Sequence, residues 1–287
     1  MEFHRVEPHH ERTRLREFLA GSDPDDYLLE EFDEWVLRDR LWVGEDDGRW
    51  VAFGRLHDLG EGEGWVSGVR VVPDRRGHGL GGELVDRILS DARSLRLEAV
   101  RAVIENENTA SSRLFGRHRF AVATEMTLRC GTPALSGSGA LRPARPGEGI
   151  PGPIGWLAGS TGRVDVLPGV DGGRFGRWRP ELVRRWSEEG KLFLGPGIAV
   201  AVQTDWWKAP RTLWANPLVG DVAPLVRALA ALTRSLQHEQ WQAFLPSGAT
   251  QRAEYEQLGL RPHPEWGDRV RLFEWLSPPP VGREPQP

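Results

Sequence analysis

The residues best suited to chemistry lie in a glycine-rich turn between a short apolar strand and a helix. The apolar strand 69–72 stops at Pro73, glycines recur through residues 77–82, and apolar residues at helical spacing predict a helix from Gly82 to about Leu95. Such a turn presents unpaired backbone N–H groups to one point, and the helix dipole adds positive potential there. Glycine permits positive φ and close approach of a ligand. The segment therefore predicts a phosphate-binding site.

Two other kinds of phosphate-binding loop, and a turn that binds nothing, are alternative interpretations of this segment. Gly77, Gly79 and Gly82 match the G-x-G-x-x-G of dinucleotide-binding folds, but Gly64 and Gly68 interrupt the preceding strand, which favours a bulged, bent strand. The lysine and Ser/Thr of a nucleoside-triphosphate loop are absent. A turn that binds nothing would carry alternating glycines that lower helix propensity without a packing benefit.

A more specific pattern in the same segment resembles the acetyl-CoA loop of the GNAT N-acetyltransferase superfamily. The loop pattern of that family is Gln/Arg-x-x-Gly-x-Gly/Ala, which Arg76, Gly79 and Gly81 fill. The predicted helix and then a strand at Ala99–Glu105 follow in the family's order. The resemblance covers about residues 1–130, which is less than half of the chain.

The family's second signature follows this strand. It consists of an Asn, a small residue three positions later, an aromatic residue seven positions later, and a closing Gly-Phe; Asn108, Ser111, Phe115 and Phe120 fall in register. Two positions depart from the pattern, because the usual Tyr is Phe115 and the usual glycine before the last Phe is Arg119. These departures bear on catalysis and local shape, whereas the cofactor loop is intact.

The resemblance implies an α/β (α+β) GNAT fold, with a mixed, mostly antiparallel sheet flanked by helices. It also implies acetyl-CoA as cosubstrate, with the pyrophosphate on the loop and the pantetheine along the preceding strand. The cofactor-binding residues that it implies are Val69, Val71, Val72, Arg76, Gly77, His78, Gly79, Leu80, Gly81, Asn108 and Ser111. The implied reaction is direct transfer of an acetyl group to an amine.

Transfer to an amine leaves two proton steps to assign. Glu105 ends the strand beside the cofactor strand and is the predicted general base, with His57 and Glu63 as weaker alternatives. Phe115 stands where family members often use the tyrosine as general acid, and it has no hydroxyl. Cys130, the only cysteine, is expected to be a buried small apolar residue. No His, Cys and carboxylate cluster has metal-ligand spacing, so no metal is expected.

Composition and charge limit which binding partners and which cellular compartment the sequence predicts. The 287 residues carry a formal net charge of −4, which gives no general case for nucleic-acid binding. No apolar run approaches the length of a membrane span, and Met1–Arg5 lacks a signal-peptide core. A cytoplasmic protein is therefore predicted.

The predicted strands and helices of the second half of the chain follow an order similar to that of the first half. Strands are predicted at 192–194, 198–203, 211–215 and 241–245, with helices opening at Asp221 and Thr250. The turn Pro217–Asp221 has one glycine, a proline without an N–H and a carboxylate that would repel phosphate. We therefore predict two tandem copies of the fold, the second degenerate. The predicted boundaries are a catalytic domain at 1–131, a linker at 132–150, a degenerate domain at 151–276 and a disordered tail at 277–287.

A predicted helix at Asp26–Arg40, with Leu29, Phe32, Val36 and Leu37 on one face, sits in an acidic stretch. Residues 23–47 contain eleven carboxylates and only two basic residues, Arg38 and Arg40, so the local charge is −11 + 2 = −9. The carboxylates are Asp23, Asp25, Asp26, Glu30, Glu31, Asp33, Glu34, Asp39, Glu45, Asp46 and Asp47. In the family, this region borders the acceptor entrance, so a small cationic amine is the predicted acceptor. The alternatives are an amine on a protein or peptide, and a CoA-binding sensor or interaction protein with little turnover.

Overall fold

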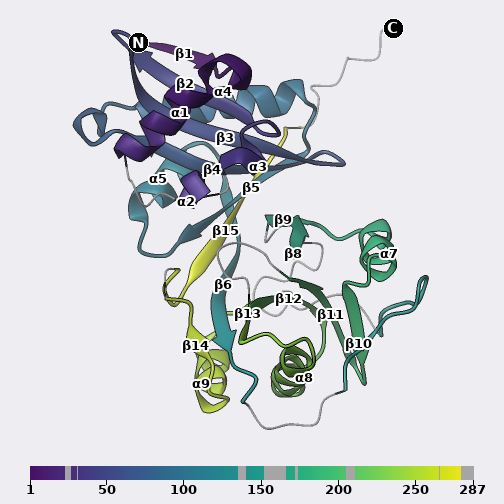
Figure 1. The fold of residues 1–287 in the computed structure, drawn as a ribbon. Helices are drawn as coiled ribbons and strands as arrows, with labels where there is room; N and C mark the ends of the chain where they lie inside the picture. Colours follow the sequence, from purple (N-terminus) through teal and green to yellow (C-terminus); the bar gives the residue numbers. More distant parts are fainter. Residues whose placement is uncertain are drawn as a thin grey trace, which may run out of the picture. The chain divides into compact units, whose positions relative to one another are not determined.

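The computed structural model describes residues 1–22, 27–30, 32–134, 140–151, 166–171, 174–204, 211–264 and 266–278. The chain forms two compact units, and each is assembled from separated segments. The first unit comprises Met1–Ala102, Thr109–Ala121 and Phe273–Pro287, and the second comprises Val103–Asn108 and Val122–Leu272. Figure 1 shows the course of the chain.

The strands of the first unit follow one another in both sequence and sheet order. They are β1 (Glu2–Arg5), β2 (Arg40–Asp46), β3 (Arg49–Gly60), β4 (Glu63–Val71) and β5 (Ala99–Glu105). Its helices are α1 (Pro8–Ser22), α2 (Tyr27–Glu30), α3 (Phe32–Trp35), the 3₁₀ turn η1 (Pro73–Arg75), α4 (Leu80–Ser94) and α5 (Thr109–Arg117). Neighbouring strands are antiparallel except β4 and β5, which are parallel. The expected mixed α/β sheet is thus confirmed.

Helices cover both faces of this sheet. The apolar face of α4 packs so closely that a Cβ on Gly54 of β3 would lie 2.9 Å from Ile88. The opposite face carries α1–α3, which bury a continuous apolar cluster that includes Leu15, Trp35 and Phe53 (Figure 1). Side chains alternate along β3, so Phe53, Arg55 and His57 face α1–α3 while Gly54 faces α4.

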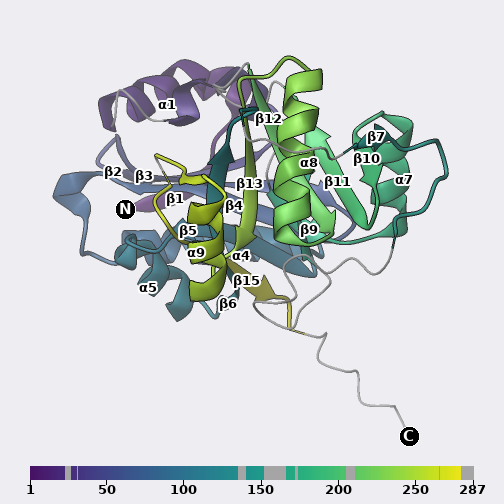
Figure 2. The ribbon, with the colours of Figure 1, turned by 90° about the horizontal axis from the view of Figure 1, so that it is seen from below.

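The second unit contains the remaining elements. Its strands are β6 (Ala121–Gly131), β7 (Arg142–Pro143), β8 (Val166–Asp171), β9 (Arg174–Arg177), β10 (Leu192–Gly195), β11 (Ile198–Gln203), β12 (Thr212–Val219), β13 (Gln240–Pro246) and β14 (Arg261–Pro262). The last strand, β15 (Val270–Leu276), is divided, because its residues up to Leu272 group with this unit and those from Phe273 onward with the first. Its helices are α7 (Pro180–Glu188), α8 (Val222–Ser235) and α9 (Ala249–Gln257). The sheet order is β15-β6-β13-β12-β11-β10-β7, while β8 and β9 form a separate pair. Helix α8 lies over the middle strands of this sheet (Figure 2).

The order of elements in the second unit repeats that of the first. Strands β10, β11 and β12, helix α8, strand β13 and helix α9 follow the same sequence of types as β2, β3, β4, α4, β5 and α5. The parallel pair also recurs, because β12 and β13 are parallel as β4 and β5 are. This correspondence agrees with the predicted repeat.

The last strand of each half joins the other half's unit. Strand β6, which ends the first half, pairs antiparallel with β13 from Trp241↔Gly131 to Pro246↔Met126. The chain from Phe273 onward instead belongs to the first unit, where the Ser277 N–H donates to the Glu98 carbonyl at 2.8 Å. Each unit is therefore completed by a strand from the distant half of the sequence.

Two predicted elements differ from the structure. The predicted helix Asp26–Arg40 ends earlier than expected: its described helical residues are Tyr27–Glu30 (α2) and Phe32–Trp35 (α3), Arg40 is already in β2 and Leu37 is exposed. Pro217 lies within β12 rather than in a turn, paired with Val200. Proline is tolerated there because the pairing of β12 with β13 stops at Ala215, so this end of β12 has the character of an edge strand. Part of the predicted linker is also ordered, since β7 pairs with β10.

Candidate functional site

The glycine-rich turn occupies residues 72–79, between β4 and α4. Its first part is the 3₁₀ turn Pro73–Arg75, and α4 begins at Leu80 directly after Gly79. Gly77 and Gly79 have φ of 82° and 85°, and a Cβ on either would meet nothing within 4 Å. Positive φ, rather than crowding, is therefore the reason that these two positions are glycine.

The backbone N–H groups of this turn divide into bonded and open donors. Those of Arg75 and Arg76 donate to the carbonyls of Val72 and Pro73 at 3.0 and 3.3 Å. The N–H of Gly82 donates to the Gly79 carbonyl at 2.8 Å. Among the described residues, none accepts a hydrogen bond from the N–H groups of 77–81. This run of open donors at the start of a helix is a site for an anion.

Side chains fix the shape of the turn from outside. Arg76 Nε donates to the Val71 carbonyl at 3.0 Å, and His78 Nδ1–H donates to the Arg76 carbonyl at 2.9 Å. Asp74 accepts two hydrogen bonds from Arg49, at 2.8 and 3.3 Å. The Arg49 guanidinium lowers the pKa of Asp74, so this anchor is charged at neutral pH.

Strand β4 provides the backbone that leads into the turn. A bulge interrupts its pairing with β3 between the pairs Phe53↔Arg70 and Arg55↔Ser67, and Gly68 there has φ of 66°. The parallel pairing with β5 ends at Trp65↔Arg101, so beyond this pair β4 has no registered partner on the β5 side in the described chain. The half-buried Val69 and Val71 lie in this stretch.

Val72 differs from Val69 and Val71, the other residues of this strand that are predicted to bind the cofactor. It is buried, and its N–H donates to the Val51 carbonyl at 2.9 Å. The backbone donor of Val72 is therefore already used within the sheet, and only the stretch up to Val71 is left as an edge for a ligand.

The predicted residues of the second signature lie around the end of β5 and in α5. Glu105 is half-buried at the end of β5, and its carbonyl accepts the Asn108 N–H at 3.0 Å. Both residues belong to the segment Val103–Asn108, which groups with the second unit. Ser111 and Phe115 lie in α5, within the first unit. The roles of these four residues stay predictions.

The ring of Phe115 is part of an aromatic core. It is 4 % exposed, and its centroid lies 4.9 Å from that of Phe120 at an interplanar angle of 76°. The ring centroid of Phe273 lies 6.4 Å from that of Phe115. These contacts give Phe115 a packing function in addition to its motif position.

The weaker candidates from the sequence are buried in polar networks or in the core. Glu63 is paired with the fully buried Arg101, which explains its burial without a catalytic role. His57 is hydrogen-bonded to Asp39. Burial raises the pKa of the Cys130 thiol to about 11, so it is no thiolate nucleophile at neutral pH and the expected apolar environment is present.

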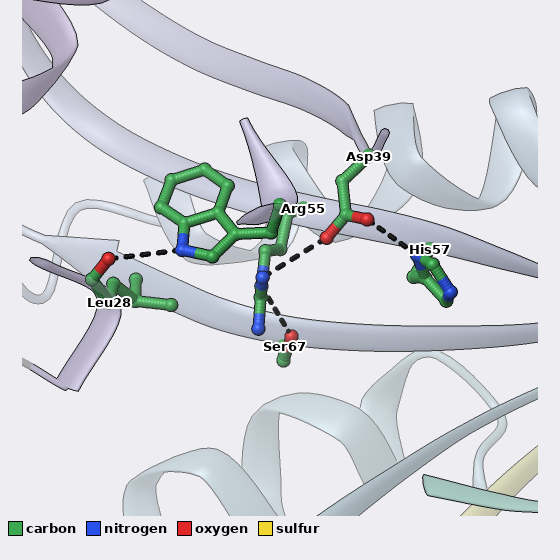
Figure 3. Close-up of polar contacts among 6 residues, drawn as sticks. Leu28, Asp39, Arg55, His57 and Ser67 are labelled. Carbon is green, nitrogen blue, oxygen red and sulfur yellow. Dashed lines mark hydrogen bonds and ion pairs between the residues drawn. The ribbon is translucent and has the colours of Figure 1, made fainter. Parts of the chain in front are cut away.

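The network of His57, Asp39 and Arg55 was not anticipated from the sequence as a unit. The side chain of Asp39, one of the acidic residues predicted at the acceptor entrance, is fully buried and contacts both His57 and Arg55 (Figure 3). No sequence motif points to Arg55. The alternation of Phe53, Arg55 and His57 within one predicted strand is the signal that could have placed two of these polar side chains on the buried face.

The acidic stretch is only partly described, and several of its described members are paired. Asp23, Asp25, Asp26 and Glu31 lie outside the described residues, as does the side chain of Glu30. Glu45 and Asp46 lie 3.0 and 2.8 Å from Arg14 and Arg75. Asp33 is paired with Arg12. Arginines from other elements therefore offset part of the charge that the sequence counts as −9.

The second unit has a much shorter connection at the position of the glycine-rich turn. Only Gly220 and Asp221 separate β12 from α8. Asp221 is the N-cap residue of α8, but its side chain makes no capping hydrogen bond. Its carboxylate would repel an anion at this helix start. The first turn of α8 also contains Pro224, which has no N–H to donate.

Two further surveys of the described chain bear on its partners. No group of three or more His, Cys, Asp and Glu side chains within it is arranged to hold a metal ion. None of its helices combines the length and the apolar character that crossing a membrane requires.

Comparison with known proteins gives a family match over part of the chain and a likeness in fold. Residues 9–120 match the family model described as "Acetyltransferase (GNAT) family". An amino-acid acetyltransferase of Mycobacterium tuberculosis is 38% identical over 83 residues, which are 28% of this chain and 45% of that protein. The match thus spans about half the length of this curated relative.

Solved structures extend the likeness beyond the family match. A candidate acetyltransferase from Thermoplasma acidophilum has a TM-score of 0.62 at 17% identity, over 96% of this chain and 100% of the other. A GCN5-related N-acetyltransferase from Sphaerobacter thermophilus has a TM-score of 0.56 at 16% identity, over 96% and 95%. At these identities the likeness concerns the fold alone.

Proposed function

We propose that this chain is an acetyl-CoA-dependent N-acetyltransferase that acts on the primary amine of a small molecule, since residues 9–120 match the model of the GNAT acetyltransferase family. The observation that carries the proposal is the run of open N–H donors at residues 77–81, held at the start of α4 by two glycines of positive φ. Such an array suits the pyrophosphate of CoA.

The residues present fit this cosubstrate. The N–H groups of 77–81 would hold the pyrophosphate, and the edge of β4 at Val69–Val71 would pair with the amides of the pantetheine. Arg76 keeps its place by its bond to the Val71 carbonyl and adds positive charge beside the turn. When bound, acetyl-CoA supplies a thioester as the acetyl donor. Holding the amine against it in fixed geometry is the main contribution that the chain can make.

We also propose that the second unit is a degenerate copy that binds no CoA. The two-residue connection Gly220–Asp221 supports this, since it has no room for a glycine-rich turn and places a carboxylate where phosphate would bind. Titration calorimetry of the whole chain with acetyl-CoA should therefore give one site per chain. Two sites per chain would contradict the degenerate second copy.

For the acceptor, we propose a small, cationic primary amine. The excess of carboxylates in residues 23–47 supports this choice, although the ion pairs of Asp33, Glu45 and Asp46 reduce the expected field. The M. tuberculosis relative is named an amino-acid acetyltransferase, so amino acids are the competing acceptor class. A peptide amine is a third class.

The assay measures release of the CoA thiol with a panel of acceptors at low and high salt. Polyamines and aminoglycoside-like amines should give higher kcat/KM than amino acids, and kcat/KM should fall as salt is added. Faster turnover of amino acids without salt dependence would assign the competing class. Binding of acetyl-CoA without thiol release from any acceptor would make the chain a CoA-binding sensor instead. The predicted cytoplasmic location is part of this proposal and rests on the sequence.

A further inference from the structure

Five buried side-chain atoms of the second unit have no hydrogen-bond partner in the described chain. They are Oγ1 of Thr127, Nε and Nη1 of Arg129, Nε1 of Trp241 and Nε of Arg252. Thr127, Arg129 and Trp241 are each at most 1 % exposed. Buried polar groups are nearly always hydrogen-bonded, because leaving a bond unmade away from water is costly. A group of such atoms therefore calls for an acceptor.

The strand pairing explains why three of these side chains gather. Thr127 and Arg129 are two residues apart on β6, so their side chains point to the same face of the sheet. Trp241 of β13 is the cross-strand partner of Gly131, the next residue of β6 on that face. A Cβ on Gly131 would lie 2.7 Å from Trp241 Nε1. The indole N–H therefore uses the space above Gly131, one strand step from Arg129.

Helix α9 covers Arg129 on this face. The guanidinium carbon of Arg129 lies 5.7 Å from the ring centroid of Tyr255, and α9 lies beside β6 in Figure 1. The Tyr255 hydroxyl donates to the Pro246 carbonyl at 2.9 Å, so Tyr255 presents the face of its ring to the cation. The cross-strand neighbour of Arg129 is Ala243, which contributes only a methyl group. These neighbours pack against Arg129 without accepting its hydrogen bonds.

A single carboxylate serves two guanidinium groups at this place. Asp268 Oδ1 accepts a hydrogen bond from Arg129 Nη2 at 2.5 Å, and its Oδ2 accepts one from Arg252 Nη1 at 3.0 Å. The formal charge of the three groups is +2 − 1 = +1. Guanidinium and indole N–H groups only donate hydrogen bonds. A ligand that completes the site must therefore accept hydrogen bonds and carry negative charge.

Buried water accounts for only part of this requirement. Water can accept the hydrogen bonds of unpartnered donors, but it is neutral and leaves the excess positive charge beside the core unbalanced. The site is also connected to solvent, because the side chains of Arg252 and Asp268 are 33 % and 43 % exposed. An anion can thus approach the two guanidinium groups from the surface.

We propose that the second unit binds a small oxyanion, a carboxylate or a phosphate group, at Arg129 and Arg252. An oxyanion supplies both the acceptors and the missing negative charge, and arginine pairs well with either kind. Thr127 Oγ1 and Trp241 Nε1 lie one strand step to either side and can donate to further oxygens of a larger ligand. The site lies on β6 and α9, away from the Gly220–Asp221 connection, and is therefore no second CoA site.

Titration calorimetry of the full chain with inorganic phosphate, and separately with acetate, tests the proposal. All chains carry Gly81→Glu, which closes the phosphate turn of the first unit to anions. At least one of the two anions should bind once per chain, and Arg252→Gln should weaken this binding about tenfold through the loss of one charge-assisted bond. Arg227→Gln is the matched control, because Arg227 is exposed on α8 of the same unit, and it should keep the full affinity.

The two anions distinguish the possible sources of the ligand. Preference for phosphate identifies a phosphate ligand, and preference for acetate identifies a carboxylate. Binding of neither anion overturns the proposal. Equal weakening by Arg252→Gln and Arg227→Gln also overturns it, since binding would then follow general surface charge.

A measurement on the unmodified chain covers the case in which a variant does not fold. In NMR spectra of the arginine Nε–H groups, the anion that binds should shift the signals of Arg129 and Arg252. Sodium chloride at the same ionic strength is the control for general salt effects. An unshifted Arg129 signal, or an equal shift with chloride, overturns the proposal. Neither measurement involves acetyl transfer, so failure here and failure of the proposed function are distinguishable.

Discussion

Arg101 of β5 donates a hydrogen bond from Nε to Glu274 Oε2 at 2.8 Å, although 173 residues separate the two in sequence. Arg101 has no exposed surface and is also paired with Glu63 of β4. All three residues belong to the first unit. A side chain from the end of the chain is thus part of the buried ion cluster of the unit that carries the phosphate turn.

Removing the cation from this cluster should be strongly destabilising. Arg101→Leu leaves Glu63 and Glu274 as two buried carboxylates without a partner cation, and we expect a loss of about 3–5 kcal/mol in the free energy of unfolding. Urea denaturation measures this value. The exposed Arg87 of α4 gives the matched control, and Arg87→Leu should change stability by less than about 0.5 kcal/mol. Equal effects of the two variants would refute the structural importance of the cluster.

Removing β15 should unfold the first unit specifically. Phe273, Glu274 and Trp275 are each at least 95 % buried, and Arg93 lies 5.2 Å above the Trp275 ring. Burial of one large apolar side chain contributes about 1.5–3 kcal/mol, a large share of the roughly 5–15 kcal/mol that holds a domain together. A chain ending at residue 269 should lose acetyl-CoA binding and become sensitive to protease within residues 1–100. A chain ending at residue 278 should retain both properties, and binding by the shorter chain would contradict the strand exchange.

A charge placed at the turn should abolish cosubstrate binding without disturbing the fold. Gly81 lacks positive φ, and a Cβ there would be in ordinary contact with Leu114 at 3.4 Å. Gly81→Glu should weaken acetyl-CoA binding by at least tenfold, or about 1.4 kcal/mol. Gly116→Glu in α5 is the control, because a Cβ there meets nothing within 4 Å. Calorimetry compares the two, and equal affinities would remove the turn from the binding site.

The buried thiol should make stability depend on pH above 9. Burial raises the pKa of Cys130 from 9.0 to about 11, so its contribution is fully present below pH 9 and is lost as pH rises through 11. The expected decrease is of the order of 2 kcal/mol by pH 11. Burial also raises the pKa of Tyr255, so the comparison with Cys130→Ala is made between pH 8.5 and 10. A stability that changes identically in both proteins over this range would contradict the burial of the thiol.

Local patterns predicted the elements around the phosphate turn well. The predicted helix from Gly82 to about Leu95 corresponds to α4 at Leu80–Ser94, and the predicted strand Ala99–Glu105 is β5. Apolar spacing and turn glycines are short-range signals, and both determine these elements. Of the predicted helix Asp26–Arg40, the described residues Tyr27–Glu30 and Phe32–Trp35 are helical, but the predicted end is wrong, since Arg40 already begins β2.

The partners of β6 and β15 could not be predicted in the same way. A strand's own residues specify which face it buries, whereas its neighbour in the sheet depends on segments far away in sequence. Nothing within 121–131 distinguishes pairing with β5 from the observed pairing with β13. For the same reason, the sequence predicts Glu63 as a candidate base, whereas in the structure it belongs to a buried ion cluster with Arg101 and Glu274.

The strand exchange also determines when the first unit can be finished during synthesis. At roughly 5–20 residues per second, the ribosome needs about 10–35 s to add the 173 residues between Arg101 and Glu274. For that interval the nascent first unit holds Arg101 without Glu274 and lacks the covering rings of Phe273 and Trp275. The first unit is therefore completed only once residues 273–275 have been made, and its acetyl-CoA site should mature no earlier than that.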